Sequence, residues 1–398
     1  MKKLEPVYWR VFALGLFALA LVWNLGLALS PASNVRGVEP NVVYTVQSYL
    51  NGEAIYPDPE EPPFPINQYT PLYYITTAET ARVLDLEPGV DVLQIYRVGR
   101  SISLVCWVLL ALFTFFFTRL YIPHVTICLV ISASVLVIPI PWYALFRIDS
   151  MGALFGITTI YLYGYYLHQA QQDDTLNRRQ AVTLLASGGA GYLAFLTKQN
   201  LVIFWGVVAS FALFQRRFTA FTLLSGGALL VLIVTSLLFS NIYSLLPGNN
   251  NFFYDHVVGG VNNGTSLEEA YTRLYSVYLS RFNMLLALTL ATIVYLLLPT
   301  ARKTLWPTQP QVYLLVWAVF VTTVVNLVSG VKVGSAINYM NEALLLSVVL
   351  VGIMVMQHDL QPVRDHSFVR LAAAALVPIY LLALFSLYAW NYRDHVTR

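Results

Sequence analysis

The chain has 398 residues, of which 58% are hydrophobic and only 11% are charged. Ordinary soluble domains carry about a quarter charged residues, so that class is excluded. The net charge of +3 is small and the basic residues form short scattered clusters, which argues against nucleic-acid binding.

Apolar segments recur along the chain, and segments of about 20 apolar residues are long enough to span a membrane. The sequence predicts about eleven such spans, and therefore an all-α polytopic membrane protein with residues 1–398 as a single transmembrane domain. The expected spans are 11–30, 98–118, 124–145, 150–168, 181–197, 200–214, 219–240, 283–299, 312–329, 340–357 and 370–390. The first has no clear cleavage site, so we interpret it as a retained anchor rather than a signal peptide.

Lysine and arginine residues in the short connections predict the orientation of the spans. They fall on alternate connections, beginning with the N-terminus: Lys2, Lys3 and Arg10, then Arg119, Arg178 and Arg179, Arg216 and Arg217, Arg302 and Lys303, and Arg364 and Arg370. The N-terminus is therefore expected in the cytoplasm, and two long loops, 31–97 and 241–282, are expected outside. An odd number of spans would also place the C-terminus outside.

The first outer loop, 31–97, is expected to carry amphipathic helices that lie in the membrane interface. Residues 41–51 have apolar side chains at helical spacing, with Gly52 as a C-cap, and 71–84 form a second such stretch. The proline-rich run between them cannot be helical. The second outer loop is rich in Asn and Gly, which suits either a mobile lid that binds an acceptor or an ordinary connector.

The polar residues that stand out in this apolar chain gather at the predicted outer ends of spans and in the two loops. A transporter needs polar groups along a pathway near the middle of the bilayer. An enzyme that works at one membrane face needs them at that face, and the observed distribution favours this second class.

Four short patterns, all on the predicted outer side, resemble the GT-C glycosyltransferases, polytopic enzymes that take a sugar from a polyprenyl phosphate. The patterns are Glu39, Tyr44, Gly52, Tyr56, Asp58 and Tyr69-Thr70-Pro71-Leu72-Tyr73-Tyr74 in the first loop; Phe146-Arg147-Ile148-Asp149; Leu196-Thr197-Lys198; and Asn338-Tyr339-Met340-Asn341-Glu342. The resemblance covers about 35–345 and is nearest to the protein-mannosyltransferase, aminoarabinose-transferase and lipopolysaccharide-core transferase branch. The chain departs from the common pattern at Pro40, where an acid or a glycine often follows the first acid.

The resemblance implies roles for acids near the outer face. Glu39 would be the general base on the acceptor hydroxyl, and Asp149 would orient the base or the acceptor. Asp58 and Glu342 would bind the sugar or the acceptor. A solvated loop acid, an exposed acidic turn or a helix cap are the structural alternatives for these positions.

A phosphate site is expected from Lys198, Arg147 and Lys332: Lys198 matches the Leu-Thr-Lys pattern, the planar fork of Arg147 suits phosphate, and Lys332 is a glycine-flanked cation near the outer face. Fixed cations there would stabilise the departing polyprenyl phosphate. Tyr69 and Asn338 would join the sugar or acceptor site. Lys198 could instead extend to the membrane interface, and Lys332 and Asn338 could belong to an ordinary loop and helix cap.

No cofactor or metal is expected, because no pair of histidines has metal-ligand spacing. Binding of a divalent cation at the acidic turn around Asp58 is an alternative that the sequence does not indicate. The expected partners are a polyprenyl-phosphate sugar donor, a glycan, lipid or protein acceptor, and membrane lipids, with no nucleic acid.

The expected function is transfer of a sugar, with inversion, from the lipid-linked donor to an acceptor hydroxyl at the extracytoplasmic face of a cell (inner) membrane. A glycan polymerase or ligase is one alternative, and a membrane transporter or flippase is another. The sequence does not identify the sugar, the acceptor or the oligomeric state.

Overall fold

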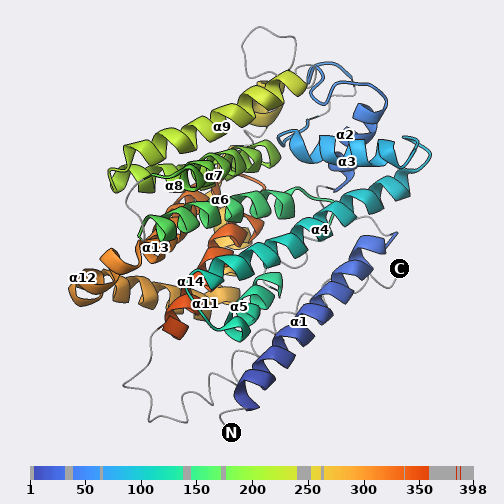
Figure 1. The fold of residues 1–398 in the computed structure, drawn as a ribbon. Helices are drawn as coiled ribbons and strands as arrows, with labels where there is room; N and C mark the ends of the chain where they lie inside the picture. The colour runs from blue at the N-terminus through green and yellow to red at the C-terminus, as the bar shows by residue number, and fades with distance from the viewer. Residues whose placement is uncertain are drawn as a thin grey trace.

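The computed structural model describes residues 4–31, 39–62, 66–137, 145–171, 176–239, 252–260, 264–335 and 337–357, together with Leu382 and Ser386. Within these ranges the secondary structure is helical and no strand occurs. Figure 1 shows the long helices side by side in one bundle, with the short helices α2 and α3 at the end where α4 begins. The expected all-α class is confirmed.

The helices follow one another along the chain with mostly short connections. Their bounds are α1 (Leu4–Leu29), α2 (Glu39–Leu50), α3 (Leu72–Val83), α4 (Val92–Arg119), α5 (Val125–Val137), α6 (Asp149–Ala170), α7 (Arg178–Thr197), η1 (Gln199–Leu201), α8 (Val202–Phe214), α9 (Phe218–Leu238), η2 (Asp255–Gly259), α10 (Leu267–Ala270), η3 (Tyr271–Tyr275), α11 (Ser276–Leu297), α12 (Pro299–Thr308), α13 (Pro310–Ser329), η4 (Ile337–Met340) and α14 (Asn341–Gln357).

Five helical segments of the described chain are long and apolar enough to cross a membrane. They are Val7–Leu29, Val92–Arg119, Phe218–Leu238, Leu267–Leu297 and Pro310–Ser329. Helices are also present over the expected spans 150–168 and 181–197, as α6 and α7, but they do not meet both criteria. The predicted number of eleven spans is therefore not confirmed. The expected span 370–390 lies outside the described residues except for Leu382 and Ser386.

Close backbone contact joins α7 to α9. A Cβ atom on Gly188 of α7 would lie 1.9 Å from the Leu224 carbonyl oxygen, and one on Gly227 of α9 would lie 2.0 Å from the Leu185 carbonyl oxygen. Glycine at these positions lets the two helices approach, as small residues commonly do in membrane helix pairs. The packing fixes α7, which carries Lys198 at its C-terminal end.

The first outer loop contains the two helices expected from the sequence, as α2 and α3. Gly52 has φ +83°, and the Glu53 amide bonds back to the Ser48 carbonyl, so Gly52 ends α2 in the left-handed conformation that favours glycine. The proline-rich run is non-helical over its described residues. The position of these helices in a membrane interface stays a prediction.

Helical structure begins inside the expected second outer loop, 241–282, and the bounds of that loop stay a prediction. Residues 267–282, assigned to the loop from the sequence, are helical and continue through α10 and η3 into α11. Ser266 caps this helix by accepting a hydrogen bond from the Glu269 amide, and Glu268 and Glu269 suit the positive end of its dipole. The polar composition of 267–282 therefore reflects a helix start, which the search for apolar segments passed over.

Candidate active site

A buried ion cluster lies where α6 begins and α7 ends. Arg147 Nε donates to Asp149 Oδ2 at 2.9 Å, and Lys198 Nζ donates to Asp149 Oδ1 at 3.0 Å. All three residues are at most 5% exposed. Asp149 is the first residue of α6, so its carboxylate also faces the positive end of that helix. The structure thus brings Asp149, expected to orient the base or the acceptor, together with the two cations expected at the phosphate.

Asp149 and Lys198 both stay charged. Burial raises the pKa of Asp149, but the charges of Lys198 and then Arg147 outweigh burial and hold this pKa well below its usual range. Burial lowers the pKa of Lys198, but Asp149 and then Glu342 outweigh burial and raise this pKa above its usual range. The cluster therefore holds two cations around one shared carboxylate.

Lys198 reaches the cluster because α7 stops abruptly before it. Its backbone is extended, with φ −155° and ψ 123°, and turns the chain from α7 into η1. The Lys198 ammonium lies 5.3 Å from the centre of the Tyr339 ring, in cation–π contact. The η4 segment, which contains Tyr339, therefore contacts the cluster directly.

Tyr69 and Lys332 face the same charges. Burial raises the pKa of Tyr69, while Arg147 and Lys198 act in the opposite direction. Burial lowers the pKa of the half-buried Lys332, and the positive charge of Lys198 lowers it further. Lys332 is therefore a further cation within electrostatic range of Lys198, and its expected contact with phosphate stays a prediction.

Glu342 and Asn338 lie buried around η4, at 2% and 7% exposure. Glu342 Oε2, Ser335 Oγ and Asn341 Nδ2 are buried without a hydrogen-bond partner in the part of the chain that the structure describes. Buried polar atoms are rarely left unpaired in folded proteins. This segment can therefore offer hydrogen bonds to a polar ligand that carries both donors and acceptors.

Glu39 occupies a different environment from the Asp149 cluster. Arg100 Nε donates to Glu39 Oε1 at 2.9 Å, and a terminal guanidinium nitrogen of Arg100 donates to Oε2 at 2.8 Å. The Phe146 amide also donates to Oε1, at 2.6 Å. Glu39 is thus linked through the backbone at Phe146 to Arg147, and both of its carboxylate oxygens are occupied.

Asp58 lies in a turn in the first loop rather than in the ion cluster. Its carboxylate accepts a hydrogen bond from the Glu60 amide at 2.9 Å. The preceding Pro57 carbonyl is 2.6 Å from His256 Nε2. Among the described interactions, none joins Asp58 to Asp149, so its expected contact with sugar or acceptor stays a prediction.

Sequence reasoning missed Arg100 and His256. Arg100 lies inside an expected apolar span, and a charged residue in that setting is itself a signal of a buried partner. His256 is fully buried, and its Nδ1 accepts a hydrogen bond from the Asn67 amide at 3.0 Å. Its role could not be found from spacing, because Asn67 and His256 are far apart in the chain.

The described residues contain no group of three or more His, Cys, Asp or Glu side chains placed to hold a metal ion. Cys106 and Cys128 are both buried and free.

Solved structures with a similar arrangement of helices include an archaeal oligosaccharyltransferase and ArnT. The oligosaccharyltransferase of Archaeoglobus fulgidus, tethered with an acceptor peptide, matches 95% of this chain with a TM-score of 0.66 and 13% identity. ArnT from Cupriavidus metallidurans, bound to undecaprenyl phosphate, matches 94% of this chain with a TM-score of 0.61 and 15% identity. The chain has the GT-C fold. It covers 55% and 64% of those two chains, so it spans little more than half their length.

The GT-C fold and the apolar helices together identify an integral membrane protein. A further structure with this fold, AglB from Archaeoglobus fulgidus with an inhibitory peptide and a dolichol-phosphate, matches with a TM-score of 0.56 and 12% identity, over 95% of this chain and 55% of its own. No family profile and no curated protein matches the sequence. At these identities the similarity establishes the fold alone.

Proposed function

We propose that this protein is a glycosyltransferase that moves a sugar from a polyprenyl-phosphate donor to an acceptor hydroxyl at the extracytoplasmic face of the cell membrane. The observation that carries the proposal is the buried cluster in which Arg147 and Lys198 share Asp149. Solved structures with the same fold hold undecaprenyl phosphate and dolichol-phosphate, which supports this class of donor.

The cations of the cluster suit the phosphate of such a donor. As the sugar leaves, negative charge develops on the phosphate oxygen, and fixed cations in a dry site stabilise that charge strongly. Arg147 would offer its planar guanidinium and Lys198 its ammonium. Asp149 holds both cations in place, and Lys332 would bind the same phosphate.

The transfer is proposed to be a single displacement with inversion. The acceptor oxygen forms a bond to the anomeric carbon while the bond from that carbon to the phosphate oxygen breaks. The electron pair of the broken bond leaves on the phosphate, and the acceptor proton passes to a carboxylate. The products are the glycosylated acceptor and the free polyprenyl phosphate.

Two carboxylates are candidates for the base. The resemblance assigns this role to Glu39, but both Glu39 oxygens are bonded to Arg100. Glu342 has an oxygen without a partner among the described residues, and its charge acts on Lys198. We infer that Glu342 is the stronger candidate for the base. A comparison of turnover between Glu342→Gln and Glu39→Gln decides between the two carboxylates.

Sugar and acceptor binding are assigned to the polar residues around the cluster. Asn338 is buried in η4, near in sequence to the unpartnered atoms of Asn341 and Glu342, and Tyr69 lies within electrostatic range of Arg147 and Lys198. We propose that these two residues contact the transferred sugar. Asp58, in its turn in the first loop, would contact the acceptor.

The proposal is tested with Lys198→Met, with Lys303→Met as a matched control on an exposed lysine of α12. Each variant is expressed at equal membrane level in cells that lack the native protein, and lipid-linked sugars and surface glycans are analysed. The expected result is that Lys198→Met accumulates one sugar-phosphate lipid and loses one glycan modification, while Lys303→Met restores both.

The same comparison separates the rival functions. Loss of long glycan chains, rather than of one sugar, would favour a polymerase or ligase. Unchanged glycans and donors in the complete absence of the protein would rule out the transferase proposal and leave transport ahead.

A further inference from the structure

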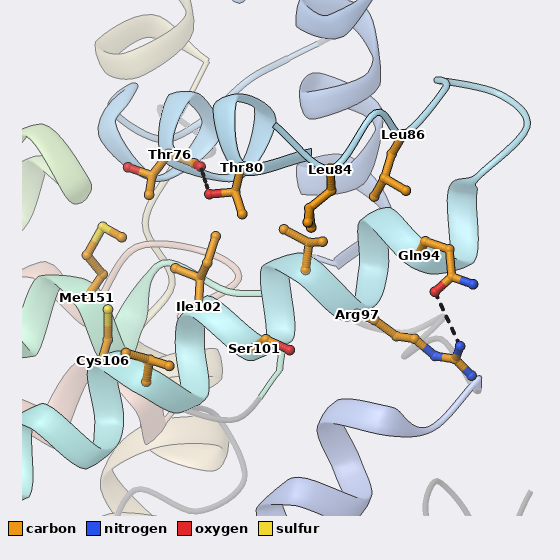
Figure 2. A pocket seen from close by; sticks show the side chains of 12 residues that line it. Thr76, Thr80, Leu84, Leu86, Gln94, Arg97, Ser101, Ile102, Cys106 and Met151 are labelled. Atoms are coloured by element: carbon orange, nitrogen blue, oxygen red, sulfur yellow. Dashed lines mark hydrogen bonds between the residues drawn. The ribbon is translucent and has the colours of Figure 1, made fainter. Parts of the chain in front are cut away.

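A groove of about 650 Å³ runs between α3 and α4, outside the Asp149 cluster. Figure 2 shows α3 along one side, with Thr76, Thr80 and Leu84, and α4 along the other, with Arg97 and Ile102. Neither the proposed transfer reaction nor the patterns of the sequence analysis use this groove.

Along α4 the groove is polar at one end and apolar along the rest, and Leu84 and Leu86 lie across from the polar end (Figure 2). Gln94 and Arg97, in the first turns of α4, form the polar end, while Ile102, Val105 and Cys106 follow deeper along the same helix. A helix rises 1.5 Å per residue, so Arg97 and Cys106 are about 13 Å apart along the axis. The groove therefore has the polarity of an amphiphile that lies parallel to α4.

The threonines of α3 do little to change this polarity. Thr76 donates its hydroxyl to the Leu72 carbonyl, and Thr80 donates to the Thr76 carbonyl, both at 2.7 Å. Because these hydroxyls are satisfied within their own helix, that wall of the groove has few hydrogen bonds to offer. The α3 wall is therefore suited to contact with the hydrocarbon chain of a ligand.

Arg97 differs from the arginines nearby. Arg100 binds Glu39, and Arg82 binds Glu79, but no carboxylate lies within salt-bridge range of Arg97 in the described ranges. Its Nε is buried without a partner, and its one hydrogen bond is a long one, 3.3 Å to Gln94 Oε1. A partly buried guanidinium that is not paired favours an anion at this end of the groove.

The groove opens sideways from a helix that crosses the membrane. Val105 of α4 and Leu84 beyond α3 are 57% and 56% exposed, and α4 belongs to a candidate span. An amphiphile in the groove would thus have its head at the end of the span and its chain along the span. This is the orientation of an ordinary lipid of the adjacent leaflet.

We propose that the groove is a binding site for an anionic phospholipid, whose phosphodiester binds Arg97 and whose acyl chain lies against Ile102, Val105 and Met151. A phosphodiester carries one negative charge, which one guanidinium matches. The polyprenyl phosphate released by the proposed transfer is a monoester with up to two negative charges, and it is better matched by the several cations of the Asp149 cluster. The site is independent of the proposed transfer reaction, because it needs no sugar donor.

The test is native mass spectrometry of the purified full chain, titrated in parallel with dioleoyl phosphatidylglycerol, dioleoyl phosphatidylcholine and undecaprenyl phosphate. The wild-type chain is expected to bind one phosphatidylglycerol more tightly than phosphatidylcholine. Arg97→Gln should weaken phosphatidylglycerol binding about tenfold, since a hydrogen bond to a charged group is lost. The matched control Arg82→Gln removes an exposed arginine of α3 and should bind as the wild type does.

A second variant tests the apolar part of the site. Ser101→Phe fills the groove from α4 and should abolish binding while Arg97 is intact. The proposal is overturned if Arg97→Gln and Ser101→Phe both bind phosphatidylglycerol normally. It is also overturned if undecaprenyl phosphate binds the wild type more tightly than phosphatidylglycerol does and Ser101→Phe abolishes this binding too, because the groove would then be a carrier site.

Discussion

The three buried carboxylates near the candidate site differ in what their oxygens contact. Asp149 binds two cations, and Glu39 binds one guanidinium with both oxygens. Glu342 has an oxygen that is buried without a partner in the described chain. A general base must have a lone pair free to take a proton, so the contacts of each carboxylate decide which role it can serve.

Glu342→Gln is predicted to reduce the rate of sugar transfer about 10²–10⁴-fold, the range of general-base catalysis, with little change in thermal stability. The unpartnered oxygen of Glu342 leaves few contacts to lose. Glu39→Gln should instead lower stability, because removing one partner of a buried ion pair costs about 3–5 kcal/mol. Purified variants are compared for turnover with a lipid-linked donor and for melting temperature. If Glu39→Gln loses turnover at unchanged melting temperature, the base is Glu39.

Arg100 is predicted to be a positioning residue that joins three segments. It binds Glu39 and also donates to the carbonyls of Leu27 and Ser30 at the end of α1. Arg100→Gln should destabilise the protein by about 3–5 kcal/mol, and Arg100→Lys by less, because lysine keeps the charge but not the planar fork. Denaturant titration in detergent measures the free energy of unfolding of each variant. Equal stability of both variants and of the exposed control Arg82→Gln would show that Arg100 is not needed for the fold.

At the scale of elements, η2, which lies outside the first outer loop in sequence, anchors that loop through hydrogen bonds of His256. His256 contacts Pro57 and Asn67, and Gln199 donates to the carbonyls of both Gln68 and Val257. Segments that are far apart in the chain thus meet next to the end of α7. The turn with Asp58 follows directly on one of these contacts.

His256→Ala is predicted to loosen the first loop at Asn67. The Asn67 amide donates to His256 Nδ1, and a hydrogen bond contributes about 1 kcal/mol, so its hydrogen exchange should become about fivefold faster. Tyr254→Ala, which truncates a side chain that is 48% exposed, is the matched control. Unchanged exchange at Asn67 in His256→Ala would mean that other contacts hold this loop.

The contact between α7 and α9 supports the position of Lys198. Gly188→Ala should cost about 1–3 kcal/mol, because its Cβ would meet a backbone carbonyl that cannot move without the whole of α9. Gly206→Ala in α8 is the control, since a Cβ there meets nothing within 4 Å. The melting temperatures of the two variants are compared in detergent. Equal values would contradict the close packing of α7 against α9.

At the scale of the whole molecule, the sequence predicted the helical class, and the resemblance predicted the GT-C fold. Arg147, Asp149 and Lys198 could be singled out through their match to the GT-C patterns, but no local pattern indicated that Asp149 would bind both cations. The partner of Glu39 could not be predicted, because Arg100 is a single charged residue within an expected span and lies far from Glu39 in the chain. The helix that begins at Leu267 inside the expected second loop was not predicted, because it begins with polar capping residues. The spacing of apolar residues along the sequence indicates which helix faces are buried. It does not indicate contacts between residues far apart in the chain, such as Asn67 and His256.

The orientation in the membrane is the remaining prediction, and the class of donor depends on it. If loop 31–97 faces outward, nucleotide sugars are scarce at the site, and a lipid-linked donor is required. Glu53→Cys in the first loop and Arg302→Cys in α12 are both exposed positions, whereas the native Cys106 and Cys128 are buried and should react slowly. A membrane-impermeant maleimide is therefore expected to label Glu53→Cys in intact spheroplasts, and Arg302→Cys only after permeabilisation. The reverse pattern would place the Asp149 cluster on the cytoplasmic side, and a soluble nucleotide-sugar donor would then become the better hypothesis.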